Sequence, residues 1–226
     1  MTITATSLTR AAAAAAVVAG AVFVAVQINH PASDTFTTET SQWVARGCAK
    51  VVMTVLALAG ITGMYLRQLR QAGWLGLIGY LVFAAGYLAM FGVEVMSVTV
   101  LPVLSGTQPE FVNDVVSAAV GGTPDGDIGA VQTLFNLAGI GYIVGGLVFG
   151  IALFRARVLA RWAAALLAVG TVGTAALAVL PESFNRPLAV PVGIALIGLG
   201  ISLWRDPQDS SVAPAPATMV REPAVR

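Results

Sequence analysis

Six apolar stretches, separated by short polar segments, divide the chain. A bilayer core about 30 Å thick needs roughly 20 mostly apolar residues in a helix, and each stretch approaches this length. The pattern therefore predicts an all-α, polytopic six-helix bundle that forms one domain over residues 1–204. The six predicted spans are Ala11–Ile28, Trp43–Leu66, Ala72–Val93 (or on to Val100), Ile128–Phe154, Trp162–Leu180 and Leu188–Trp204.

The first stretch has a second interpretation. Arg10 followed by an alanine-rich apolar run is also typical of a secretory signal peptide, whose removal would leave five spans. The run is longer than the usual apolar core of such a peptide, and no clean cleavage site of the small-x-small type precedes Asp34. We therefore expect the first helix to be retained.

Basic residues gather on one side of the predicted membrane. The loops on the other side carry mostly carboxylates, with Arg186 as the basic exception. Lys and Arg in short loops mark the cytoplasmic face, so this pattern predicts that both termini are cytoplasmic in a bacterial plasma (inner) membrane. The basic residues on the predicted inner side are Arg10, Arg67, Arg70, Arg155, Arg157, Arg161, Arg205, Arg221 and Arg226.

Two segments lie outside the predicted spans. Residues 205–226 are rich in proline and small polar residues, which predicts a disordered cytoplasmic tail. The loop from Pro102 to Asp127 contains apolar residues at helical spacing, which predicts a short amphipathic helix that lies on the membrane or caps the bundle. Asp127 is placed to N-cap the fourth span. The spaced apolar residues are Phe111, Val112, Val115, Val116 and Ala119.

Composition agrees with a membrane protein and narrows the chemistry. Hydrophobic residues make up 57% of the chain and charged residues 10%, against about 25% charged in soluble domains. A net charge of +1 gives no reason to expect a nucleic-acid partner. The single histidine, His30, excludes bis-histidine haem ligation, and the single cysteine, Cys48, excludes a cysteine metal cluster. We therefore expect no cofactor, no metal and no enzymatic activity.

One group of polar residues falls within or beside the spans. Tyr87 and Glu94 are seven residues apart on the third span, and Gln132 and Asn136 share a face of the fourth. Antiparallel packing brings Glu94 and Gln132 to similar depth, within reach of Lys50 on the second span. These five residues are the candidate polar pocket, open to the outer side.

The pocket has two interpretations. In one, it binds a small ligand, a lipid head group or a proton, because ionisable groups within a membrane usually serve a function. In the other, which we favour, Lys50 and Glu94 form an interfacial ion pair, while Gln132 and Asn136 hydrogen-bond across a helix seam. The face of this seam continues through Gly139, Ile143, Gly146 and Gly150. In this view Arg46 only extends to the outer interface.

The function that the sequence indicates is a non-enzymatic membrane module. It would bind membrane lipid, or a partner protein through the outer segment Phe111–Ala119. The alternative is a small permease or exporter that uses Glu94 as its coupling carboxylate, as a homo-oligomer if six spans do not suffice. The pairs Gly141/Gly145 and Gly146/Gly150 have small-xxx-small spacing, and we expect them to contact helices within the bundle rather than a second copy.

Three segments resemble small uncharacterised multi-span membrane proteins of high-GC Gram-positive bacteria. They are Gln27-Ile28-Asn29-His30-Pro31 after the first span, Met64-Tyr65-Leu66-Arg67-Gln68 after the second, and the Gly150–Trp162 stretch that joins the fourth and fifth. In the last stretch similar proteins often have proline before Arg-Trp, where this chain has Ala160. The resemblance implies a membrane bundle, and no activity or cofactor follows from it.

Overall fold

The computed structural model describes residues 4–31, 36, 38–178, 180 and 184–205, and all of its regular secondary structure is helical. The predicted tail beyond Arg205 lies outside these residues. Within them, helices follow one another through short connections. They are α1 (Ala5–Ala25), α2 (Thr40–Arg67), α3 (Leu69–Thr99), α4 (Leu101–Leu104), α5 (Pro109–Ala119), α6 (Ala130–Ala156), α7 (Arg161–Gly173), the 3₁₀ helix η2 (Thr174–Ala178) and α8 (Asn185–Arg205).

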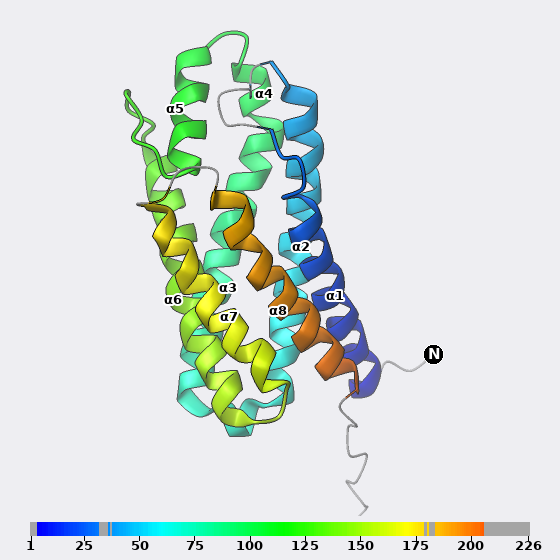
Figure 1. Ribbon diagram of the computed structural model, residues 1–226. Coiled ribbons are helices and arrows are strands. Elements are labelled where there is room, and N and C mark those ends of the chain that lie inside the picture. The colour runs from blue at the N-terminus through cyan, green and yellow to red at the C-terminus, as the bar shows by residue number, and fades with distance from the viewer. Residues whose placement is uncertain (1–3, 32–35, 37, 179, 181–183, 206–226) are drawn as a thin grey trace, which may run out of the picture.

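The long helices form a closed ring in chain order. Along the ring α1, α2, α3, α6, α7 and α8 each pack against the next, and α8 returns to pack against α1. Consecutive helices run in opposite directions, so α1 begins and α8 ends at the same end of the bundle (Figure 1). At the other end, α4 continues from α3, and α5 packs against α4 and α6 (Figure 1).

Five of the described helices are long and apolar enough to cross a bilayer: α1, α2, α3 with α4, α6 and α8. The third helix agrees with the longer of the two predicted spans, the one that reaches Val100, since α3 continues through Thr99. Near its start, Gly73 has φ 56° and ψ −154°, a conformation that suits glycine, and it breaks the helix before Trp74.

The fifth predicted span, Trp162–Leu180, is not a single α-helix over its described length, and its crossing of the membrane stays a prediction. The α-helix ends at Gly173 and continues as η2, while Leu180 lies beyond both. The Thr171 hydroxyl donates to the carbonyls of Leu167 and Ala168, at 2.9 and 3.1 Å. The Thr174 hydroxyl donates to the Thr171 carbonyl at 2.6 Å. These local bonds, together with glycine at 173, favour the change to the tighter helix.

Glycines set the close contacts between helices. Gly141 lies against the backbone of Gly86, and Gly145 lies against the backbone of Phe83, so α6 approaches α3 without intervening side chains. On another face of α6, Gly146 lies against Thr171 of α7, and Gly150 against Ala168. The prediction that these two glycine pairs contact helices within the bundle is confirmed.

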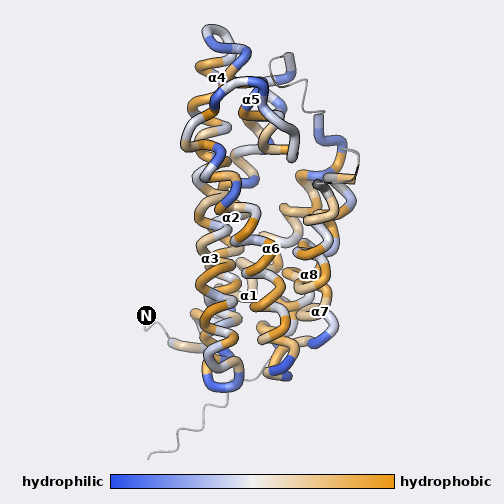
Figure 2. The backbone as a smooth tube through the Cα atoms, turned by 90° about the vertical axis from the view of Figure 1, so that its left-hand side faces the viewer, coloured by the Kyte–Doolittle hydropathy of each residue, from blue (hydrophilic) through white to orange (hydrophobic). Residues whose placement is uncertain are grey.

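The outer surface of the bundle is apolar over its middle. Figure 2 shows hydrophobic residues along the central length of the helices and hydrophilic residues concentrated at the two ends. A soluble protein rarely exposes contiguous apolar surface on this scale, whereas a lipid-facing surface requires it. The exposed side chains include Val52, Val55, Ile78, Leu81, Leu88, Leu137, Ile140, Val144, Val169 and Val172.

A second hydrophobic core lies above the first. It brings α4 and α5 together with the segment before α2 and the start of α6, and we call this part the cap. Asp127 does not N-cap α6 as expected. Its carboxylate instead accepts from the N–H of Gly129 at 2.7 Å, and Gly129, with φ 59°, is the N-cap residue. The buried residues of the cap core are Phe36, Leu101, Val112, Val115, Val116 and Ile128.

Candidate functional site

Lys50 and Glu94 form an ion pair between α2 and α3. Lys50 Nζ lies 3.3 Å from Glu94 Oε1, and the two side chains are 19% and 13% exposed. Gly47, one turn from Lys50, lets α2 approach Val98 of α3 closely, because a Cβ there would overlap Val98 Cγ1. Each charge is therefore matched by the other, as the second interpretation of the sequence expected.

The pair lies near the end of the bundle that carries the cap. Seventeen residues of α2 separate Lys50 from Arg67, which is about 25 Å of helix at 1.5 Å per residue. Twenty-one residues of α3 separate Glu94 from the Gly73 break, or about 31 Å. With the basic end at one boundary of a core about 30 Å thick, the pair falls close to the opposite boundary.

Gln132 and Asn136 form a separate contact on α6. Gln132 Nε2 donates to Asn136 Oδ1 at 3.1 Å, and the Asn136 side chain is exposed. Farther along the same face, a Cβ on Gly139 would meet no atom within 4 Å. The predicted seam therefore contacts α7 only at Gly146 and Gly150. The α-helical part of α7 ends before it comes level with Gly139.

Tyr87 lies in the bundle core between α3 and α6. It is buried, and its ring is 5.0 Å from Phe83 and 6.0 Å from Tyr142, centroid to centroid. No hydrogen-bond partner for its hydroxyl is found among the described residues. The five candidate residues therefore belong to three separate contacts, and a cavity shared by all of them stays a prediction.

Arg46 has a role that the sequence did not suggest. Its guanidinium donates to the carbonyls of Val26, Ile28 and Asn29, at 3.1, 2.9 and 2.8 Å. These carbonyls end α1, where the helix dipole is negative, so the arginine both satisfies them and neutralises that charge. In an antiparallel hairpin the start of one helix adjoins the end of the previous one, and this rule is the sequence signal that could have found the contact.

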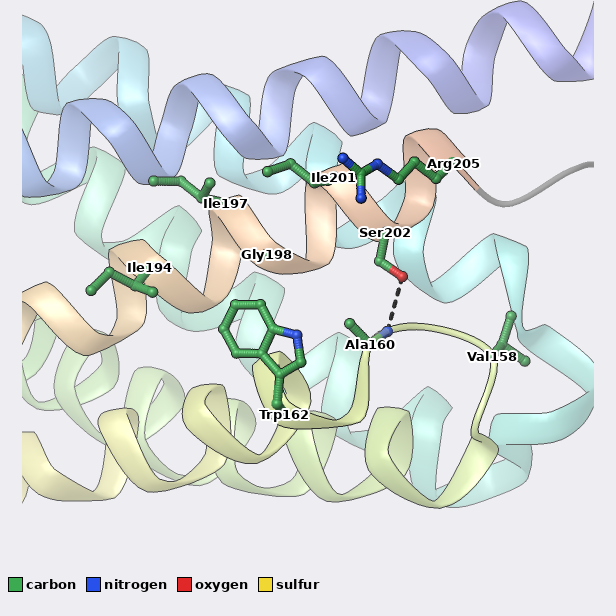
Figure 3. Close-up of a pocket in the computed structure, with 9 residues that line it drawn as sticks. All are labelled: Val158, Ala160, Trp162, Ile194, Ile197, Gly198, Ile201, Ser202 and Arg205. Carbon is green, nitrogen blue, oxygen red and sulfur yellow. Dashed lines mark hydrogen bonds between the residues drawn. The ribbon is translucent and has the colours of Figure 1, made fainter.

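A pocket of about 610 Å³ lies between α7 and α8 at the basic end of the bundle. No sequence motif indicates this pocket, because its lining comes from two helices and the α6–α7 connection. Figure 3 shows its apolar wall on α8, the Trp162 indole across from that wall, and Arg205 at one end. The lining residues are Val158, Ala160, Trp162, Ile194, Ile197, Gly198, Ile201, Ser202 and Arg205.

Carboxylate side chains in the cap form hydrogen bonds that stabilise its fold. Asp114 on α5 accepts from the N–H groups of Asp125 and Gly126 at 2.9 and 3.0 Å, which ties the loop after α5 to that helix. Among the described residues, no group of three or more His, Cys, Asp or Glu side chains is placed to hold a metal ion.

Comparisons with known proteins found no match, whether with family models, with curated proteins or with solved structures. The resemblance to membrane proteins of high-GC Gram-positive bacteria therefore stays a prediction, and the geometry alone supports the proposals that follow.

Proposed function

We propose that the chain is an integral membrane protein that crosses the bilayer six times. Five helices have the length and composition for a crossing. The sixth crossing is α7 with η2: thirteen residues at 1.5 Å and five at about 2 Å reach about 30 Å, the thickness of the hydrocarbon core. Its packing along both α6 and α8 supports this assignment.

The orientation follows from the charges at the two ends. The end opposite the cap carries arginines of four connections or helix ends, which favours the cytoplasm for that side of a bacterial plasma membrane. With six crossings, both termini lie on that side and the cap lies outside. The described arginines of the inner end are Arg10, Arg67, Arg70, Arg155, Arg157, Arg161 and Arg205.

Within this topology, the protein acts as a non-enzymatic module that presents the cap to a partner protein. The observation that carries this proposal is the separate core of the cap, which holds α5 in a fixed position. Val112, Val115 and Val116 face inward, whereas Glu110 and Asn113 are exposed. The partner surface proposed here is therefore the polar face of α5, and the apolar residues of Phe111–Ala119 serve the cap instead.

A photo-crosslinking residue at position 113 tests the proposal in intact cells. We expect an adduct of one defined mass that disappears when Glu110→Arg reverses the charge beside it. The same probe at Leu137, which is 60% exposed on the apolar surface, is the matched control. Equal labelling patterns at positions 113 and 137, or an adduct unaffected by Glu110→Arg, would contradict a partner surface on α5.

The permease alternative receives less support from the geometry. A coupling carboxylate must exchange its proton or ion with solvent on both sides, whereas Glu94 is paired with Lys50 near one boundary. The arrangement favours a structural role for the ion pair, which holds α2 against α3.

A further inference from the structure

The pocket between α7 and α8 opens on the surface that faces lipid. Ile194 and Ile201 on α8 are 43% and 39% exposed, and Trp162 on α7 is 59% exposed. The pocket is therefore a groove in the side of the bundle rather than a chamber within it.

The wall of the groove is held in place by close packing. The Trp162 ring lies directly against Gly198, where an added Cβ would meet the ring at 2.7 Å from Cζ2. The small residue lets the benzene edge of the indole approach the backbone of α8. The shape of the groove thus comes from the packed helices themselves, before any molecule binds.

The groove has the length of one leaflet. Eleven residues of α8 separate Ile194 from Arg205, which is about 17 Å of helix. Half of a hydrocarbon core about 30 Å thick is about 15 Å. A chain lying along Ile201, Ile197 and Ile194 would therefore extend from the basic end of the bundle to the middle of the membrane.

Polar groups are gathered at the basic end of the groove. Arg205 lies there, and the nitrogen edge of the Trp162 indole is turned toward Ala160 and Ser202 (Figure 3). Ser202 Oγ accepts from the Ala160 N–H at 2.9 Å, so its own hydrogen can be donated to another oxygen. Among the residues that the structure describes, no carboxylate forms an ion pair with Arg205.

We propose that this groove binds an anionic diacyl phospholipid of the cytoplasmic leaflet. One acyl chain lies along the isoleucines, the glycerol ester region meets Ser202 and the Trp162 indole, and the phosphate meets Arg205. Charge complementarity selects the anionic class, because a basic residue at the cytoplasmic interface attracts anionic head groups more strongly than zwitterionic ones. The proposal rests on the membrane topology given above but is independent of the cap and its partner.

Quenching of Trp162 fluorescence by brominated lipid measures occupancy of the groove. The full chain with Trp43→Phe, Trp74→Phe and Trp204→Phe retains Trp162 as its one tryptophan and is reconstituted in phosphatidylcholine vesicles. Brominated phosphatidylglycerol or brominated phosphatidylcholine is then added at the same low fraction. We expect the relative binding constant of the anionic lipid to be about fivefold higher, the effect of roughly one basic residue near the membrane surface.

Charge variants identify the residue responsible. Arg205→Gln should remove the preference, whereas Arg205→Lys should keep it. Arg70→Gln, an exposed arginine at the same end but on α3, should also keep it. Equal quenching by both lipids would mean contact with bulk lipid only. Loss of the preference in Arg70→Gln as much as in Arg205→Gln would mean diffuse charge, and either result overturns the proposal.

A second measurement tests the proposal if the variant with three tryptophan substitutions does not fold. The unsubstituted chain and Arg205→Gln are extracted from membranes in mild detergent, and the retained lipid is quantified by mass spectrometry. Enrichment of anionic over zwitterionic lipid relative to the membrane is expected only with Arg205, and equal enrichment in both would overturn the proposal.

The design separates this proposal from the topology and from the partner. Vesicles of symmetric composition offer the same lipid to either end of the bundle, so a reversed orientation leaves the quenching result unchanged. Failure to float with vesicles would instead contradict membrane insertion itself. The crosslinking result at position 113 depends on the cap alone.

Discussion

Arg46 and Lys50 lie one turn apart on α2, and each bonds to a neighbouring helix rather than to its own. Arg46 binds the end of α1, and Lys50 binds Glu94 of α3. A charge placed near the membrane boundary is costly unless a partner compensates it. These two contacts therefore connect three helices at the capped end, and the apolar environment strengthens the electrostatic interactions in them.

Arg46→Gln should destabilise the bundle. It removes charge-assisted hydrogen bonds to three carbonyls, and each such bond contributes about 1.5–3 kcal/mol when it is made to a charged group. Because glutamine retains part of the bonding, we expect a net loss of about 2 kcal/mol in the free energy of unfolding, measured by denaturant titration in micelles. Arg70→Gln, at an exposed position, is the control and should change it by less than about 0.5 kcal/mol. Equal effects would contradict the role of Arg46.

Glu94→Gln should also cost about 2 kcal/mol, because it leaves the half-buried Lys50 ammonium without its counter-charge. In the double variant Lys50→Met with Glu94→Met, no uncompensated charge remains, and the loss should be smaller than that of Glu94→Gln alone. A loss in the double variant equal to or greater than that of Glu94→Gln would contradict a direct interaction. A permease coupled through Glu94 would show a different result: substrate uptake lost in both variants, whatever their stability.

At the scale of elements, the contact between α3 and α6 depends on the absence of side chains. Gly86, Gly141 and Gly145 bring the two backbones together over several turns. Without a hydrophobic driving force between helices in lipid, close van der Waals contact supplies most of the association. The same helix has Gly139 on a face that nothing covers, so one element provides both a test position and its control.

Gly145→Ala should weaken the contact between α3 and α6. Its Cβ would overlap the backbone of Phe83, which cannot move without shifting α3, and overpacking of this kind costs about 1–3 kcal/mol. Gly139→Ala meets no atom within 4 Å and should be neutral or stabilising by up to about 1 kcal/mol, through helix propensity. Thermal unfolding in detergent compares the two. If Gly139→Ala proved the more damaging, the helix contact described here would be wrong.

The sequence predicted most elements because length and hydropathy determine them locally. The five long helices, the ion pair between Lys50 and Glu94, and the glycine contacts all follow from spacing along single helices. The end of α7 did not, because bonds from Thr171 and Thr174 to the backbone compete with the helix in a way that hydropathy does not record. Nor did the Asp127 contact, since the positive φ of Gly129 moved the start of α6.

At the scale of the whole molecule, the ring of helices explains why some predicted sites separate. Lys50 and Glu94 lie at the contact between α2 and α3, whereas the Gln132–Asn136 pair lies on a part of α6 that α7 does not reach. The sequence predicted that these residues lie at similar depths in the membrane, and the prediction grouped them for that reason. The residues lie on different faces because of how each helix is rotated about its own axis. That rotation depends on all the neighbouring helices at once.

The ring also gives the two ends of the molecule different roles. The capped end contains a second hydrophobic core, Arg46, and the ion pair, and it exposes the polar face of α5. The basic end contains the groove between α7 and α8. In the proposed topology the cap follows the third crossing and lies outside whether or not α7 crosses, whereas the end of α8 lies on the side of the arginines only if α7 also crosses.

Labelling of single cysteines in intact cells tests the six crossings most directly. In a Cys48→Ser background, Asn113→Cys in the cap, Gln71→Cys at the basic end and Phe184→Cys after α7 are each treated with a membrane-impermeant maleimide. With six crossings, positions 113 and 184 label rapidly, and position 71 labels only after the membrane is permeabilised. Protection of position 184 until permeabilisation, as at position 71, would mean that α7 does not cross and would contradict the six crossings.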